Sequence, residues 1–145
     1  MKSRFITTLD KRDLNDKEFA LLSPLVYRSE LLEGTIVVPK GFVSDGSSTP
    51  RLPIVYWMFG DRAHHEAVIH DFIYRSPGHA VIVSKANGVT ETIFVSKELA
   101  DDVFYEAMDV RGKGAFVKRG MWFGVWFGGH SSYKSGPSRY RIADI

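Results

Sequence analysis

The order of apolar and polar residues predicts strands in the first half of the chain. In segment 24–30, Leu25 and Tyr27 are two residues apart and would share one face of a strand, so this segment predicts a short strand. The β-branched run within 35–43 predicts a second strand after a turn. Pro39 and Gly41 indicate a sheet edge or a bulge inside it. The next residues, 44–53, are rich in Gly, Pro, Ser and Asp and predict a loop.

The second half of the chain has the periodicity of apolar residues that is typical of helices. We expect three helices, over residues 62–75, 97–108 and 115–128. Ser96 is suited to cap the second helix, which ends near Gly112. Asn87-Gly88 predicts the turn of a short hairpin between the first two helices. The expected fold class is therefore α+β, with N-terminal antiparallel strands and loops followed by about three packed helices, in a single domain over 1–145.

Composition narrows the class of protein. A length of 145 residues with 44% apolar side chains is enough for one hydrophobic core. The absence of cysteine excludes disulfides and thiolate metal sites and is compatible with a reducing cytoplasm. No apolar run reaches the length of a signal peptide or of a membrane-spanning helix. We therefore expect neither a leader nor a membrane span.

Positive charge is concentrated towards the C-terminus. Residues 1–110 carry 12 Lys and Arg against 16 Asp and Glu, a balance of −4, whereas residues 111–143 carry seven basic residues and no acid. A basic stretch with many aromatic residues predicts an anionic partner, such as a membrane surface, a nucleic acid or an acidic protein face. The alternative is a solvated surface that only offsets the acidic remainder.

The third expected helix carries a row of glycines. Gly120, Gly124 and Gly128 recur every four residues and so share one helix face. Glycine costs a helix roughly 1 kcal/mol per site relative to Ala, which a closely packed backbone can offset. The flanking Trp and Phe side chains either fill the domain core or face a partner or a membrane. The glycine face is accordingly a candidate oligomer contact.

The segment HHEAVIHDFIY carries three of the five histidines and most of the candidate chemistry. On a helix, Glu66, His70 and Tyr74 are four residues apart and line one face. Asp71 is rotated by about 100° from His70. Because the other positions are mostly apolar, we expect this helix to be largely buried, with its polar row hydrogen-bonded or lining a cavity.

The second helix offers one acidic side chain that can face the first. Its apolar stripe includes Met108, and Asp101 lies only about 20° beyond that residue on a helical wheel. Asp102 falls between Glu106 and Asp109, on the side expected to face water. Asp101 is therefore the carboxylate expected to reach inward.

An imidazole held by a buried carboxylate can act as a general base towards water, because the carboxylate fixes the tautomer and stabilises the imidazolium. His70 and Asp101 are thus candidate catalytic residues, with Tyr74 beside them. A second carboxylate, Asp71, could hold a hard cation together with Asp45 of the predicted loop. The alternative is a set of satisfied core hydrogen bonds, in which His70 and Tyr74 are tied to Asp101 for structure alone.

Three motifs along the chain resemble those of a known family. They are VPKGFVSDGSSTPR, then AVIHDFIY, then ELADDVFYEAM, and the Gly- and aromatic-rich segment follows. Their order resembles a tailed-phage and prophage family called domain of unknown function thirteen fifty-three, over roughly residues 20–130. The resemblance implies a phage-encoded protein, often encoded beside virion or tail genes. It also implies synthesis in the host cytoplasm and an association with the virion.

A more distant similarity bears on mechanism. HDFIY followed by LADDVF is similar to the His-Asp-x-x-Tyr and Ala/Cys-Asp-x-x-Phe pattern of secreted and parvoviral phospholipases of the A-two type. The similarity implies that His70 is the general base that activates water and that Asp71 binds Ca²⁺. It further implies that Tyr74 and Asp101 anchor the histidine.

The residues and the resemblance together support two hypotheses. The first is a phage hydrolase, similar to a phospholipase, that acts on an ester at an anionic membrane surface. The second is a non-catalytic virion component of the tail or connector, which contacts other virion proteins and in which the same polar cluster is a structural lock. A nucleic-acid partner is least favoured, because no recognition-helix pattern accompanies the basic charge.

Overall fold

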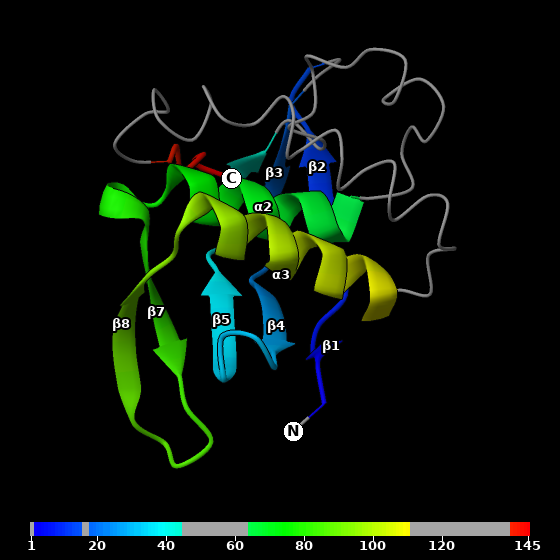
Figure 1. The fold of residues 1–145 in the computed structure, drawn as a ribbon. Helices are drawn as coiled ribbons and strands as arrows, with labels where there is room; N and C mark the ends of the chain where they lie inside the picture. Colours follow the sequence, from blue (N-terminus) through cyan, green and yellow to red (C-terminus); the bar gives the residue numbers. More distant parts are fainter. Residues whose placement is uncertain (1, 16–17, 45–63, 111–139) are drawn as a thin grey trace.

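Two antiparallel sheets and two long helices form the part of the chain that the computed structural model describes, residues 2–15, 18–44, 64–110 and 140–145 (Figure 1). The larger sheet has the strand order β1-β4-β5-β7-β8, formed by Arg4–Phe5, Leu25–Ser29, Gly34–Val38, Ala80–Ser84 and Thr90–Phe94. The smaller sheet has the order β2-β3-β6, formed by Lys11–Asp13, Phe19–Leu21 and Val43–Ser44. The helices are α2, His64–Arg75, and α3, Lys97–Val110, and a short 3₁₀ helix η2, Pro77–His79, follows α2.

Strands β4 and β5 lie inside the larger sheet, and their side chains alternate between the core and the outer face. They pair antiparallel along their whole length. Leu25 and Tyr27 are buried on the same face of β4, as their two-residue spacing predicts. The strand expected over 35–43 is interrupted after Val38, and β6 belongs to the other sheet. Gly41 lies in the break with a φ of 87°.

The expectation of N-terminal strands and loops followed by about three packed helices is wrong. The described residues form eight strands in two sheets and only two long helices, and the strands β7 and β8 come between the helices in sequence. Strands β1, β2, β3 and β6 are two or three residues long, too short to produce a recognisable alternation. The α+β class in general holds.

The hairpin predicted at Asn87-Gly88 is confirmed. Strand β7 pairs with β8 in antiparallel register, and Gly88 has the positive φ, 84°, that such a turn favours. The hairpin joins the larger sheet next to β5. The third expected helix, 115–128, lies outside the described residues, and with it the row of Gly120, Gly124 and Gly128.

Helix α2 packs against α3 and also contacts β5 and β6. Residues 66–74 are consequently all buried. Helix α3 begins after Ser96, whose hydroxyl accepts a hydrogen bond of 3.1 Å from the backbone N–H of Leu99, as expected for a capping residue. Figure 1 shows the two helices side by side across one end of the larger sheet, with the β7–β8 hairpin extending past them.

The C-terminal segment 140–145 returns to the strands next to α2. The backbone N–H of Ala143 donates to the carbonyl oxygen of Gly41 over 2.7 Å. A Cβ atom at Gly41 would lie 2.7 Å from the Ala143 carbonyl oxygen. The ring of Tyr140 packs on Phe72 of α2, with ring centroids 5.2 Å apart. The segment therefore covers part of α2 and requires a glycine at position 41.

Candidate functional site

The polar row expected on α2 is buried in the structure. Glu66, His70 and Tyr74 are 0%, 1% and 3% exposed, and Asp71 is 2% exposed. Burying polar side chains costs free energy unless they are hydrogen-bonded, so their partners decide what the row can do. His70 and Tyr74 reach α3, whereas Asp71 reaches β6.

The structure brings His70, Tyr74 and Asp101 together between the two helices. Nε2 of His70 lies 2.9 Å from Oδ1 of Asp101, and the Tyr74 hydroxyl donates to the same oxygen over 2.6 Å. Oδ2 accepts a hydrogen bond of 2.7 Å from the ammonium of Lys97, one turn earlier on α3. Asp102 is exposed. Asp101 thus faces inward and Asp102 outward, as the helical wheel predicts.

The neighbours of Asp101 favour its charged form. Burial alone raises the pKa of this carboxyl. Hydrogen bonding and charge from His70, with hydrogen bonds from Lys97 and Tyr74, outweigh burial, and the pKa of Asp101 lies below its ordinary value. A carboxylate that has left water but accepts three hydrogen bonds is stable as an anion.

An anionic Asp101 can only accept hydrogen bonds, and this assigns the tautomer of His70. Neutral imidazole must carry its proton on Nε2 and present a lone pair at Nδ1. Nδ1 is buried and has no hydrogen-bond partner among the described residues. A buried acceptor without a partner is costly, so Nδ1 is the point at which a water or a substrate atom would bind.

The dyad, defined here as His70 and Asp101, is enclosed. Each of its two side chains is 1% exposed. The rings of Tyr74 and Phe104 contact the imidazole, with centroid distances of 4.0 and 5.1 Å. Two surface pockets bounded by described residues, of about 430 and 600 Å³, are lined by other side chains. Within the described part of the chain, the dyad therefore does not border an open cleft, although water activation requires access to Nδ1.

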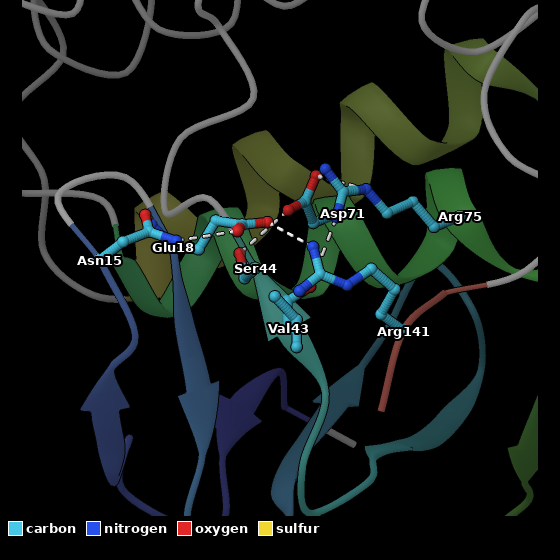
Figure 2. Close-up of polar contacts among 7 residues, drawn as sticks. All are labelled: Asn15, Glu18, Val43, Ser44, Asp71, Arg75 and Arg141. Atoms are coloured by element: carbon cyan, nitrogen blue, oxygen red, sulfur yellow. Dashed lines mark hydrogen bonds and ion pairs between the residues drawn. The ribbon is translucent and has the colours of Figure 1, made fainter. Parts of the chain in front are cut away.

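Asp71 lies on a different side of α2 and takes part in a second polar cluster (Figure 2). Its Oδ2 atom accepts a hydrogen bond of 2.9 Å from the hydroxyl of Ser44 in β6. Its Oδ1 atom is 3.7 Å from Nε of Arg75, one turn later on α2. Arg75 also donates to the carbonyl oxygen of Val43 over 3.4 Å. Asp71 is thus already next to a cationic side chain.

The same cluster ties the C-terminal segment to the N-terminal part of the chain. Arg141 donates to Oε2 of Glu18 over 2.8 Å, and Asn15 donates to Oε1 of Glu18 over 3.0 Å. The hydrogen bond from Asn15 is the main reason that the pKa of Glu18 lies below its ordinary value; burial opposes it, and the charge of Arg141 adds to the lowering. Figure 2 shows these residues gathered beside β6 and α2.

The described residues do not by themselves complete the calcium site that the phospholipase similarity implies. No group of three or more His, Asp or Glu side chains within the described ranges is placed to hold a metal ion. Asp45, the second expected ligand, lies outside them. Asp71 supplies one carboxylate, whose charge Arg75 already compensates in part. Calcium binding stays a prediction.

Two contacts of α3, one buried and one half-buried, were not expected from the sequence. The first is Lys97 with Asp101, which their four-residue spacing on a helix could have indicated. The second is Glu106, expected on the water side, which accepts hydrogen bonds of 2.7 Å from each of the hydroxyls of Tyr27 and Ser29. Burial and then the hydrogen bond to Glu106 raise the pKa of Tyr27 far above its ordinary value. No local sequence pattern predicts the contact of Glu106 with Tyr27 and Ser29, because these residues are far apart in the sequence.

The fold and the site define an α+β domain with a His-Asp dyad buried between two helices. The chain belongs to the DUF1353 family, a protein family of unknown function, whose family model matches residues 19–125. This confirms the family resemblance of the three motifs, and the matched stretch contains both residues of the dyad. The chain matches no curated protein and no solved structure. None of the described helices is both long and apolar enough to cross a membrane.

Proposed function

We propose that this protein is a hydrolase in which the His70–Asp101 dyad activates water for attack on an ester. One observation carries the proposal. Asp101 engages Nε2 of His70, while Nδ1 of the same ring is buried without a hydrogen-bond partner among the described residues. An imidazole oriented in this way has one nitrogen held in place and a lone pair on the other, which can act as a base once water reaches it.

In the proposed reaction, Nδ1 of His70 accepts a proton from water as the water oxygen forms a bond to the ester carbonyl carbon. The resulting imidazolium is stabilised by Asp101, which stays ionised. The imidazolium then gives the proton to the alcohol oxygen as the bond between that oxygen and the carbonyl carbon breaks. The products are a carboxylic acid and an alcohol, and the dyad returns to its starting state.

Tyr74 and Lys97 are positioning residues in this proposal. Tyr74 donates to the oxygen of Asp101 that contacts His70, and Lys97 donates to the other oxygen. With both oxygens held, the carboxylate cannot rotate away from the imidazole. Lys97 also compensates the charge of the carboxylate in a place where an unpaired charge is costly.

The substrate class that we infer is a phospholipid ester at an anionic membrane surface. The similarity of the dyad motifs to phospholipases of the A-two type supports this choice. So does the basic composition of 111–143, with seven Lys and Arg and no acid. Basic residues near an anionic membrane each contribute about 1 kcal/mol of attraction. In this proposal the phage-encoded enzyme is made in the host cytoplasm and meets the membrane from there or from the virion.

Hydrolysis by the purified full-length chain tests the proposal. The substrates are a p-nitrophenyl ester and vesicles of phosphatidylglycerol and phosphatidylcholine, each with calcium and with a chelator. We expect the wild type to release acid and His70→Ala to be slower by roughly 10²–10⁴-fold. Asp102→Asn is the matched control, because it changes an exposed carboxylate next to Asp101. A wild type that hydrolyses neither substrate, or an equally active His70→Ala variant, would contradict the proposal.

The chelator arm of the same assay tests calcium separately. If Asp71 binds calcium, chelation abolishes hydrolysis, and Asp71→Asn raises the calcium concentration that half-maximal activity requires. If hydrolysis is unchanged by the chelator, calcium is removed from the proposal and the chemistry of the dyad is unaffected.

A second proposal is a non-catalytic component of a phage tail or connector, in which the dyad is a structural lock. The enclosure of both side chains favours it, as do the three side chains that donate to Asp101. Under this proposal, Asp101→Ala lowers the melting temperature and blocks particle assembly, and the wild type hydrolyses no ester. Normal particle assembly by a clearly destabilised Asp101→Ala variant would contradict it.

A further inference from the structure

Strand β8 lies at one end of the larger sheet, and no described strand pairs with its outer edge. Figure 1 shows the β7–β8 hairpin as the outermost part of this sheet, extending beyond both helices. The sequence of β8, TETIF, is rich in β-branched and aromatic residues and contains no Pro, Gly, Lys or Arg. Natural proteins commonly block an open sheet edge with Pro or with charged side chains, especially Lys. The edge of β8 is therefore able to pair with another strand.

The hydrogen bonds of the hairpin determine which main-chain groups of β8 face outward. The N–H of Val95 donates to the carbonyl of His79, and the N–H of Lys85 donates to the carbonyl of Val89, each over 2.8 Å. Opposed residues of an antiparallel ladder alternate between hydrogen-bonded and non-hydrogen-bonded pairs. Both bonded pairs join odd-numbered residues. Odd-numbered residues of β8 therefore bond to β7, and even-numbered residues direct their N–H and C=O groups away from it.

The outward-facing residues are Thr90, Thr92 and Phe94, evenly spaced about Thr92. We propose that β8 pairs antiparallel with β8 of a second copy of this chain, about a twofold axis at Thr92. In this register Thr92 faces its own counterpart, and Thr90 faces Phe94 of the second copy. Every one of these pairs exchanges two main-chain hydrogen bonds, so the two larger sheets join into one.

The side chains of β8 are compatible with a second copy. Glu91 is the one charged residue of the strand, and its carboxylate lies 3.8 Å from the ammonium of Lys85 in the same hairpin. Two copies therefore meet without uncompensated like charges. On the other face, Phe94 and Ile82 are 65% and 66% exposed. Pairing covers the open edge and places Phe94 across the junction, where its apolar surface leaves water.

A single cysteine at the axis tests the register, because the natural chain has none. In a hydrogen-bonded pair the two Cα atoms are about 5.5 Å apart, within the roughly 4.4–6.8 Å that a disulfide spans. Thr92→Cys should thus form a disulfide-linked dimer under mild oxidation. Thr90→Cys is the matched control, because two copies of this residue would lie about 14 Å apart. Cross-linking that is equal in the two variants would overturn the register.

Sedimentation equilibrium of the full-length chain tests the dimer itself. Thr92→Pro removes an N–H that makes no bond to β7, so the monomer is expected to keep its fold, as circular dichroism can verify. We expect it to weaken dimerisation by at least about tenfold, whereas Thr92→Ala, which keeps the N–H, changes it by less than about threefold. A dimer that persists in Thr92→Pro overturns the proposal. A wild type that stays monomeric at every concentration also overturns the proposal. The edge of β8 could then pair only with a strand of another protein.

Discussion

Replacing Asp101 by Asn tests how much the dyad stabilises the contact between α2 and α3. The substitution keeps the size of the side chain but removes the negative charge that His70, Tyr74 and Lys97 contact. The ammonium of Lys97, whose side chain is 8% exposed, then loses its counter-charge. Breaking a buried ion pair by removing one partner costs about 3–5 kcal/mol. That is a large part of the roughly 5–15 kcal/mol by which a domain is stable.

A double-mutant cycle separates the ion pair from the rest of the cluster. Lys97→Met removes the ammonium and retains an unbranched apolar side chain. The double variant Lys97→Met with Asp101→Asn contains no buried charge at this point. We therefore expect it to lose less free energy of unfolding than the sum of the two single variants, with a coupling of roughly 1–3 kcal/mol.

Urea-induced unfolding followed by circular dichroism gives the free energies of unfolding from the midpoint and the slope. Asp102→Asn is the control for the loss of a carboxylate on α3, and should change stability by less than about 0.5 kcal/mol because Asp102 is exposed. If the two single substitutions were additive, or if Asp101→Asn cost less than about 1 kcal/mol, the buried pair would not be what joins the helices, and the reasoning would be refuted.

Three further predictions concern pH, backbone conformation and the contact of α3 with β4. The pKa of Asp101 is lowered in the folded protein, so the ionised carboxylate contributes fully to stability above the ordinary pKa of 3.8. This contribution is lost as the pH falls through the lower pKa of the folded state. Urea midpoints across an acidic pH series should therefore fall more steeply for the wild type than for Asp101→Asn. In Gly41→Ala the new Cβ atom would lie 2.7 Å from a carbonyl oxygen and the residue would keep a positive φ, whereas in Gly78→Ala only the positive φ is unfavourable. The melting temperature should therefore fall more for Gly41→Ala than for Gly78→Ala. Equal falls in the two variants would contradict the steric account. Tyr27→Phe removes the hydroxyl that donates to Glu106 over 2.7 Å and should cost about 1 kcal/mol in urea unfolding, whereas no loss would show that the bond is not stabilising.

Helices α2 and α3, the hairpin and the direction of the key side chains could be predicted from the sequence. Helical periodicity places residues four apart on one face whatever surrounds the helix. It therefore put His70 and Tyr74 in one row and turned Asp101, rather than Asp102, towards the core. The hairpin followed from a dipeptide whose backbone preference is local. These features depend on residues that are neighbours in sequence, so a sequence pattern can express them.

The short strands could not be predicted, for a physical reason. Strands β1, β2, β3 and β6 have two or three residues each, and they exist because partner strands elsewhere in the chain satisfy their backbone groups. The same limit applies to Glu106, whose partners Tyr27 and Ser29 lie on β4. A helical wheel assigns a side chain to a face, but it does not say which element covers that face.

The sequence by itself determined that α2 is a buried helix with a polar row and that α3 turns one carboxylate inward, because both follow from local periodicity. Only the tertiary structure decided that His70 meets Asp101 at 2.9 Å, that Lys97 and Tyr74 hold the same carboxylate, and that the dyad is enclosed. Distances between side chains on different helices depend on how those helices pack. Packing is set by all the residues of the core together, and no single segment of the chain contains it.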